Sequence, residues 1–481
     1  MRGQAGGRHA AVLRAGGRRK KGVSAALAAA WSAEVGRLAG EAARALAPGG
    51  DGLAAAEAVI REGVLRLGGG ILGELLSADT GYRGPRVACG NGHEAAFTGY
   101  RGKVIDTVVG EARLRRAWYH CARCRRGRGH GRGLAPRDAE LGITGASLSP
   151  GLAAMAATAG AAVPFARAAG LIRDLAGIRL TVKRVERAAE AAGAAGAAAA
   201  RQEAGLVARR KVVPLPPAPL PDKLYAVIDG TGVPVTRKET EGRDGKGEDG
   251  RARTREVKMA VFFTQDKVND EGYPVRDRAS SSYIATFEPA SQFAGLVKAE
   301  GIRRGSDHVR QMTVIGDGAA WIWNIASDKF PGATQIVDLY HAREHLHSLT
   351  RSLEFMLLGR KDEWLAARLE DLDYGYIDGI VDATRKYPLI GIKKDEVDKE
   401  LGYFLNNAPR MRYHWFRQCG LFVGSGVVEA GCKSVIGQRL KQSGMHWTVD
   451  GADSIIALRT AEASSQWEAT CLNRHNQTPA A

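Results

Sequence analysis

A proline-rich segment divides this chain of 481 residues into two parts whose apolar residues repeat at different intervals. Five of the ten residues in Val212-Val-Pro-Leu-Pro-Pro-Ala-Pro-Leu-Pro221 are proline, which fixes φ and favours a stiff, extended connector. Before this segment, apolar side chains recur at helical spacing, as at Ile60 and Val64. After it, they form short runs that are typical of strands. We therefore predict several domains and place a boundary at residues 212–222.

The elements expected beyond the proline-rich segment follow a definite order. Apolar runs predict strands at residues 224–228, 257–264, 282–287, 312–315 and 334–337, and helical spacing predicts helices at residues 290–302 and from residues 319 and 340. Three strands followed by alternating helices and strands is the order of an RNase H-like core, in which parallel strands extend three antiparallel ones. A helical segment at residues 350–418 interrupts this core before its last element. The predicted fold class is a multidomain α+β and α/β protein.

The positive charge of the chain is concentrated in its first part. The whole chain has 69 Lys and Arg against 52 Asp and Glu, a net charge of +17, and residues 1–135 alone hold 23 basic against 10 acidic residues. This asymmetry favours a polyanionic partner, and we expect double-stranded DNA. No apolar run reaches the roughly 18 residues of a membrane helix, and we interpret residues 18–31 as a basic arm that enters a helix rather than a signal peptide. We expect no membrane association.

Three of the six cysteines cluster with a histidine. Cys89 and His93 form one pair at knuckle spacing, and Cys121 and Cys124 form another. Because these are the usual ligands of tetrahedral zinc, we predict one structural Zn²⁺ in a ribbon at residues 80–144, in a reducing cytoplasm. The alternative is a group of buried thiols without metal. Arginines crowd the ribbon, and we expect them to contact DNA phosphates: Arg113, Arg115, Arg116, Arg123, Arg125, Arg126 and Arg128.

The pattern of residues 145–211 is typical of a helix-turn-helix. A helix at residues 165–175 ends near Gly177, and Thr181 is placed to cap a second helix whose Val182 and Val185 would pack inward. The outer face of the second helix then carries the residues expected to contact DNA: Lys183, Arg184 and Arg187. A small helical bundle that does not bind DNA has the same pattern, and that alternative stays open.

Three acidic residues stand where an active site is expected. Asp229 and Asp317 each follow an apolar strand and precede a glycine, and Glu429 begins a helix beyond the insertion. In the expected topology the strands that carry the two aspartates are neighbours. Two divalent ions bound by such oxygen ligands can activate a nucleophile and stabilise charge during phosphodiester cleavage, so we predict a site for two Mg²⁺ or Mn²⁺ ions. Taken singly, each aspartate has a structural alternative, because Asp also caps helices and forms Asx turns.

These segments resemble the DDE transposases of bacterial insertion sequences, in particular the ISKra group, which is related to the mutator-type enzymes. The similarity extends over residues 80–465. It implies that Asp229, Asp317 and Glu429 bind the catalytic metal ions. The resemblance also covers Asp338-Leu-Tyr-His341, where His341 would orient DNA beside the metal site or, alternatively, only share a helix face with His345. In the similar segment 439–447, Arg439 and Lys441 are expected to contact DNA.

The resemblance implies a transposase that binds the terminal inverted repeats of its own element and cuts and joins DNA. We expect it to act as a homo-oligomer on DNA, at the nucleoid in the bacterial cytoplasm. Two alternatives remain open: a regulatory DNA-binding protein with an inactive nuclease fold, and another RNase H-like nuclease. The predicted parts are a basic arm with helices (1–79), the zinc ribbon (80–144), the helix-turn-helix (145–211), the linker (212–222), the core (223–349), the helical insertion (350–418), and the last core helix with a tail (419–481).

Overall fold

The computed structural model describes residues 25–124, 133–143, 145, 147–245 and 250–468. The chain forms two compact units, Met1–Ser149 and Pro150–Ala481, and each is considered by itself. The proline-rich segment therefore runs within the second unit, whereas we expected it to separate domains. The basic arm, Arg125, Arg126 and Arg128 lie outside the described residues. Among the described residues, no helix combines the length and the hydropathy needed to cross a membrane.

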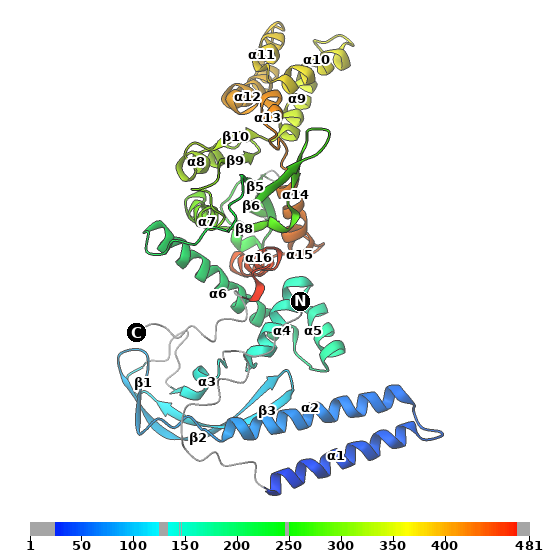
Figure 1. Ribbon diagram of the computed structural model, residues 1–481, viewed down its shortest axis with the longest axis vertical. Helices are drawn as coiled ribbons and strands as arrows, with labels where there is room; N and C mark the ends of the chain where they lie inside the picture. The colour runs from blue at the N-terminus through cyan, green and yellow to red at the C-terminus, as the bar shows by residue number, and fades with distance from the viewer. Residues whose placement is uncertain (1–24, 125–132, 144, 146, 246–249, 469–481) are drawn as a thin grey trace. The chain divides into compact units, whose positions relative to one another are not determined.

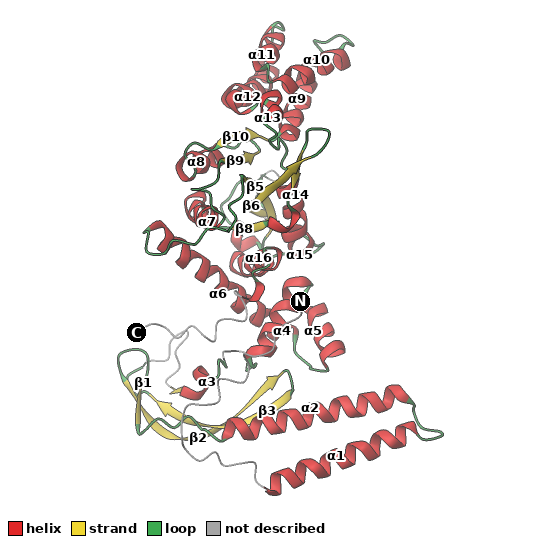
Figure 2. Ribbon diagram, in the orientation of Figure 1, coloured by secondary structure: helices red, strands yellow, loops and turns green. Residues whose placement is uncertain are grey.

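The first unit packs a helical hairpin against a four-stranded antiparallel sheet of order β1-β2-β3-β4 (Figure 2). The helices predicted within residues 1–79 are present as α1 and α2. Helix α2 lies directly on β3 because glycine leaves room: a Cβ at Gly73 would lie 2.7 Å from the carbonyl oxygen of Arg113. The elements are α1 (Ala25–Leu46), α2 (Leu53–Ser77), β1 (Arg86–Ala88), β2 (Glu94–Thr107), β3 (Gly110–His120), β4 (Gly133–Leu134) and α3 (Pro136–Glu140).

The second unit is built around one mixed sheet. Its strands are β5 (Lys223–Pro234), β6 (Thr254–Val268), β7 (Pro274–Arg276), β8 (Ser282–Thr286), β9 (Gln311–Gly316) and β10 (Thr334–Val337). The order is β10-β9-β5-β6-β7, and β8 also pairs with β6. The strands β10, β9 and β5 are parallel, and β6 is antiparallel to β5, β7 and β8. The strands expected from the apolar runs are all present, so the prediction of a mixed α/β protein is confirmed at this level.

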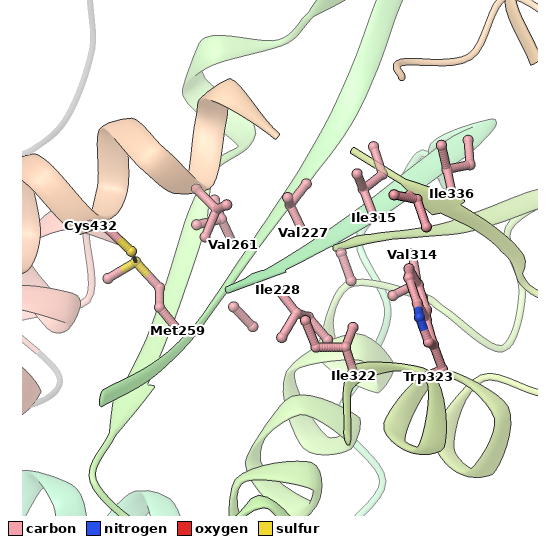
Figure 3. Packing of buried hydrophobic residues seen from close by; sticks show 14 of the residues in the cluster. Val227, Ile228, Met259, Val261, Val314, Ile315, Ile322, Trp323, Ile336 and Cys432 are labelled. Carbon is pink, nitrogen blue, oxygen red and sulfur yellow. Dashed lines mark hydrogen bonds between the residues drawn. The ribbon is translucent and has the colours of Figure 1, made fainter. Parts of the chain in front are cut away.

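Helices cover the sheet because successive strand residues point to opposite faces and both faces are apolar. Figure 3 shows Ile322 and Trp323 of α8 against Ile228 and Val314, and Cys432 against Met259 elsewhere in the same core. The connecting helices are α7 (Ala290–Arg303), α8 (Ala320–Lys329) and α9 (Leu339–Leu353). The chain then forms the helical insertion with α10 (Lys361–Tyr374), α11 (Ile377–Arg385), α12 (Gly391–Asn407) and α13 (Tyr413–Gln418) (Figure 1).

The helices before the proline-rich segment belong to the same unit as the sheet. They are α4 (Pro150–Ala162), α5 (Phe165–Leu171) and α6 (Val182–Ala208). Helix α6 packs against the last helix, α16 (Val449–Ala463), so closely that a Cβ at Gly193 would lie 1.9 Å from the carbonyl oxygen of Ser454. Thr181 does cap α6 by accepting a hydrogen bond from the Arg184 amide, at 3.4 Å. Val185 is buried as predicted, but Val182 is 46% exposed, so its predicted inward packing is wrong.

Candidate metal centres

Three aspartates stand side by side at one edge of the second unit's sheet. Ile228 of β5 pairs with Gly316 of β9, and Gly316 pairs with Val337 of β10. The next residues along these parallel strands are Asp229, Asp317 and Asp338. Because the carboxyl ends of adjacent parallel strands share an edge, the strand register alone brings the three carboxylates to one place. The predicted neighbourhood of the strands that carry Asp229 and Asp317 is confirmed.

Asp229 lies half-buried within β5, at the point where the pairing of β5 with β9 stops and only the pairing with β6 continues. Its carboxylate accepts a hydrogen bond from the Gly230 amide at 2.6 Å, and the Cys432 thiol lies 3.8 Å from its second oxygen. Burial and the nearby charge of Asp317 raise the pKa of Asp229, against the opposing effects of the Gly230 amide and His341. Burial also raises the pKa of Cys432 to about 12, so this thiol is neutral at physiological pH. A cation beside Asp229 and Asp317 would relieve their repulsion.

Tyr403 of the helical insertion contacts the turn that carries Asp317. The carboxylate of Asp317 accepts a hydrogen bond from the Ala319 amide at 2.9 Å, an Asx turn that was one of the structural alternatives. Its carbonyl accepts a hydrogen bond from the Tyr403 hydroxyl of α12, also at 2.9 Å. Gly318 has φ of +106°, and a Cβ there would lie 2.5 Å from the Tyr403 ring. Glycine is thus required at this turn both by its backbone conformation and by the approach of Tyr403.

Asp338 joins the sheet to the segment that carries Glu429. It is fully buried and caps α9 by accepting from the His341 amide at 2.8 Å, and it also accepts from the Ser425 amide. Ser425 precedes α14 (Gly426–Gly431), which carries Glu429, and its hydroxyl lies 3.3 Å from the Glu429 carboxylate. Asp338 therefore fixes the start of α14 and, through it, the approach of Glu429 to the strand ends.

His341 contacts the same buried carboxylate. Its Nδ1 lies 3.2 Å from the Asp338 carboxylate. The hydrogen bond with Asp338 is the main reason that the pKa of His341 rises to about 9, and the charges of Asp229 and Asp317 contribute in the same direction. Burial raises the pKa of Asp338, but its hydrogen bonds with His341 and Ser425 outweigh this effect and keep it below its usual value. His345, one turn further along α9, instead stacks on Tyr403.

The tightest group of possible ligands at this edge differs from the predicted one. The ligand atoms of Asp338, His341 and Glu429 all lie within 4.8 Å of one another. However, both oxygens of Asp338 already accept hydrogen bonds from amides, and its side chain has no exposed surface. We therefore regard Asp338 as the residue that positions its neighbours. Asp229, Asp317 and Glu429, each partly exposed at this edge, remain the predicted ligands.

The residues predicted to contact DNA near this edge divide into two kinds. Lys441 is exposed, and its ammonium lies 2.5 Å from the Thr231 hydroxyl, two residues beyond Asp229. Arg439 is only 1% exposed, so the expectation that it contacts DNA is wrong. Its guanidinium lies between the rings of Phe165 and Trp447 and donates to the Gly160 carbonyl at 3.0 Å. It stabilises the packing of α4 and α5 against the segment after α15 (Gln438–Leu440).

The residues predicted to contact DNA on α6 lie largely on its outer side. Lys183 and Arg187 are exposed and Arg184 is half-buried. Lys183 forms an ion pair with Glu186 at 2.6 Å. The inner side of the helix is occupied by the core of the second unit. The exposure of Lys183 and Arg187 does not test whether they contact DNA, so the helix-turn-helix interpretation stays a prediction.

The second candidate centre lies in the first unit, where the four residues predicted to bind zinc converge. The Cys89 and Cys124 sulfurs lie 3.7 Å apart, and the His93 Nδ1 lies 3.7 Å from the Cys124 sulfur and 4.0 Å from that of Cys121. Ligands of a tetrahedral zinc ion, at about 2.3 Å from the metal, lie about 3.8 Å from one another. The donor set and its spacing therefore fit one Zn²⁺. The site can hold a zinc ion, as predicted.

The arginines of the zinc ribbon are not all available to phosphates. Arg116 is 9% exposed and forms an ion pair with Asp138 at 3.0 Å, so its predicted phosphate contact is wrong. Arg115 is exposed and lies 4.3 Å above the Tyr100 ring. Arg113 is also exposed, beside Glu111. Arg123 is exposed as well, and these three remain candidates among the described arginines that were predicted to contact phosphates.

Tyr403, Ser425 and Cys432 were missed in the sequence. Ser425 and Cys432 lie within four residues of Glu429 but were not assigned a role, and nothing near Tyr403 in the chain indicates one. Only the glycine at position 318 hinted at a close neighbour. No protein-family model and no curated protein matches this chain.

Proposed function

We propose that this protein is a DDE transposase of an insertion sequence: a metal-dependent enzyme with an RNase H-like core that cuts and joins DNA. One observation carries the proposal: Asp229 and Asp317 directly follow Ile228 and Gly316, the last residue pair of the parallel strands β5 and β9, and Asp338 positions the segment that carries Glu429. The strand order, the net charge of +17 and the resemblance of these segments to ISKra-group enzymes support the same conclusion.

The residues at this edge suit Mg²⁺ or Mn²⁺. Carboxylate oxygens are the ligands that hard divalent ions prefer. Burial, and to a smaller extent the charge of Asp317, raises the pKa of Asp229, and a bound cation would favour its charged form. Asp229, Asp317 and Glu429 would hold the ions. When bound, the ions supply a nucleophile at neutral pH and stabilise charge on the reacting oxygens.

Three other residues near this edge would position the DNA or the metal ligands. His341, which Asp338 keeps protonated at neutral pH, would orient a phosphate oxygen of the strand to be cut. Lys441, exposed beyond Asp229, would contact the DNA backbone. Tyr403 would hold the Asp317 turn rigid while DNA is bound.

The test compares Asp229→Asn, Asp317→Asn and Glu429→Gln with the unaltered protein on DNA that carries the ends of the element. We expect each substitution to lower cleavage and strand joining by at least about 1,000-fold, because the loss of one charged ligand disrupts the metal site. Binding of the same DNA should change little, because it depends on phosphate contacts elsewhere. Glu256→Gln, which alters an exposed carboxylate on β6, is the matched control. Undiminished cleavage by any of the three variants would remove that acid from the mechanism.

A further inference from the structure

The helical insertion exposes a group of aromatic side chains that the proposed reaction does not use. Tyr374, Tyr376 and Trp415 are 48%, 63% and 46% exposed, and His414 is exposed as well. They lie on α10, on the turn that leads to α11, and on α13 (Figure 1). We call these four residues the aromatic platform. Exposed aromatic rings in a group are uncommon on a soluble surface and mark a binding site.

A single glycine aligns the first two rings. Gly375 ends α10 in the left-handed conformation, with φ of +82°, and a Cβ there would lie 2.9 Å from the Met411 carbonyl. The chain therefore reverses between Tyr374 and Tyr376, whose rings stack at 5.8 Å with an angle of 11° between their planes. The His414 ring continues the row at 5.2 Å from Tyr374. The His414 ring is tilted by 35° to that of Tyr374, and all three side chains are exposed to solvent.

Arginines surround the platform. Arg412, which is exposed, lies 4.9 Å above the Trp415 ring. Arg343 and Arg417 both approach Asp373, the residue before Tyr374, at 2.8 and 3.6 Å, so two positive charges share one carboxylate. Trp415 and Arg412, together with Arg410 and Gln335, also line a hollow of about 350 Å³. A cavity of this size can take a planar ring system.

The platform and the carboxylate edge are attached to one hydrophobic core. Tyr413, next to His414, is fully buried in the same cluster as Val337, the residue before Asp338.

We propose that the aromatic platform binds unpaired nucleotides of DNA, whose bases stack on the rings while arginines contact the adjoining phosphates. Base stacking on an exposed aromatic ring is tolerant of sequence, and guanidinium groups beside the rings match the charge of the backbone. The inference rests on the proposed function for its choice of DNA, and it adds a substrate class: DNA with a single-stranded portion next to the strand that is cut. A protein partner would use such aromatic residues equally well, but Arg412 beside the Trp415 ring and Arg410 in the same hollow favour a ligand that carries phosphates.

The experiment measures the binding of the full-length protein to an oligothymidine strand and to a duplex of equal length, by fluorescence anisotropy. Tyr376→Ala and Trp415→Ala should each weaken binding of the single strand by about 5- to 100-fold, the range found for loss of one stacked base. They should weaken binding of the duplex less than about twofold, since duplex DNA is held mainly through its phosphates. Tyr376→Phe should retain tight binding, because it keeps the ring. Tyr273→Ala, at an equally exposed tyrosine far along the chain on another turn, should have no effect.

A second readout reports stacking directly. A 2-aminopurine placed in the single strand should lose fluorescence when the protein binds, and Tyr376→Ala should restore it. Equal loss of single-strand and duplex binding in both alanine variants, or no loss in either, would overturn the proposal, and the second result would assign the platform to a protein partner. These measurements need no metal and no cleavage. If Asp317→Asn leaves cleavage intact while the platform variants lose single-strand binding, the proposed metal site fails and the platform stands.

Discussion

Asp338 is the residue on which the carboxylate edge depends most. Its two oxygens accept hydrogen bonds from the amides of His341 and Ser425, whose positions differ by 84 residues in the chain, and its side chain is fully buried. The spacing of Asp338 and His341 drew attention to both residues in the sequence. Neither the contact with Ser425 nor that of Tyr403 with Asp317 could be predicted, because each joins segments that are far apart in the chain and whose side chains have no periodic pattern.

His341 should carry a proton at neutral pH in the metal-free protein. Its pKa of about 9 lies above the ordinary value of 6.5, so its contribution to stability is fully present below pH 6.5 and is lost as the pH rises through about 9. NMR titration of the ring resonances, with His341→Gln to identify the signal, measures this directly. Asp338→Asn should return the pKa toward 6.5. A His341 signal that titrates near 6.5 in the unaltered protein would contradict the assignment of this pair.

Among the elements, the strands of the second unit were the most predictable, because each is a short apolar run that ends at glycine or a charged residue. Residues 334–337 form a strand as expected, and the other predicted strands are present. However, β5 continues to Pro234, six residues beyond its predicted end at Ile228, so Asp229 lies within this strand and does not follow it as predicted. Helix α6 was less predictable. Its cap at Thr181 was identified, but its alanine- and glycine-rich surface gave no sign that it packs against α16, more than 200 residues later.

Because α2 packs directly on β3, we expect alanine to have opposite effects on stability at two neighbouring glycines of α2. Gly73→Ala should destabilise the first unit by about 1–3 kcal/mol, because the added methyl group would overlap the Arg113 carbonyl. Gly70→Ala, where nothing lies within 4 Å of the new methyl, should stabilise the same helix by about 0.5–1 kcal/mol through the lower chain entropy of alanine. Thermal unfolding of residues 1–149 compares the two. Equal effects of the same sign would show that α2 does not rest on β3 in this way.

The zinc ribbon depends on its metal, because Cys89, His93, Cys121 and Cys124 surround only a small apolar cluster. Protein purified without added metal should contain one zinc per chain. Removal of the zinc with a chelator should lower the thermal midpoint of the first unit and expose the amides of β1 and the start of β2 to hydrogen exchange. Cys124→Ser should have the same effect, and Cys419→Ser, at an exposed cysteine outside the site, should not. A zinc content near zero would leave the alternative of unliganded thiols.

For the whole molecule, the boundary after Ser149 predicts which fragments fold. Residues 150–481 should form a stable unit, whereas residues 222–481 should aggregate, because they lack α4–α6 and leave Arg439 without Phe165 and Gly160. We placed a domain boundary at the proline-rich segment because its composition is typical of a stiff connector. A stiff connector can also run within a single unit, as this one does. Size-exclusion chromatography and thermal unfolding of the two fragments make the comparison. A cooperative transition in residues 222–481 at an unchanged temperature would restore the boundary at the linker.

The packing of α6 against α16 also sets an order of events on the ribosome. At roughly 5–20 residues per second, the residues of α16 are synthesised some tens of seconds after those of α6, and during that interval the part of α6 around Gly193 lacks the helix against which it packs. Ser425, Glu429 and Arg439 arrive in the same late stretch. The nascent chain therefore completes its carboxylate edge and its last structural helix together. A prematurely terminated product would retain the four possible zinc ligands and the nearby arginines but lack Glu429, so under the proposed function we expect it to bind DNA without cutting it.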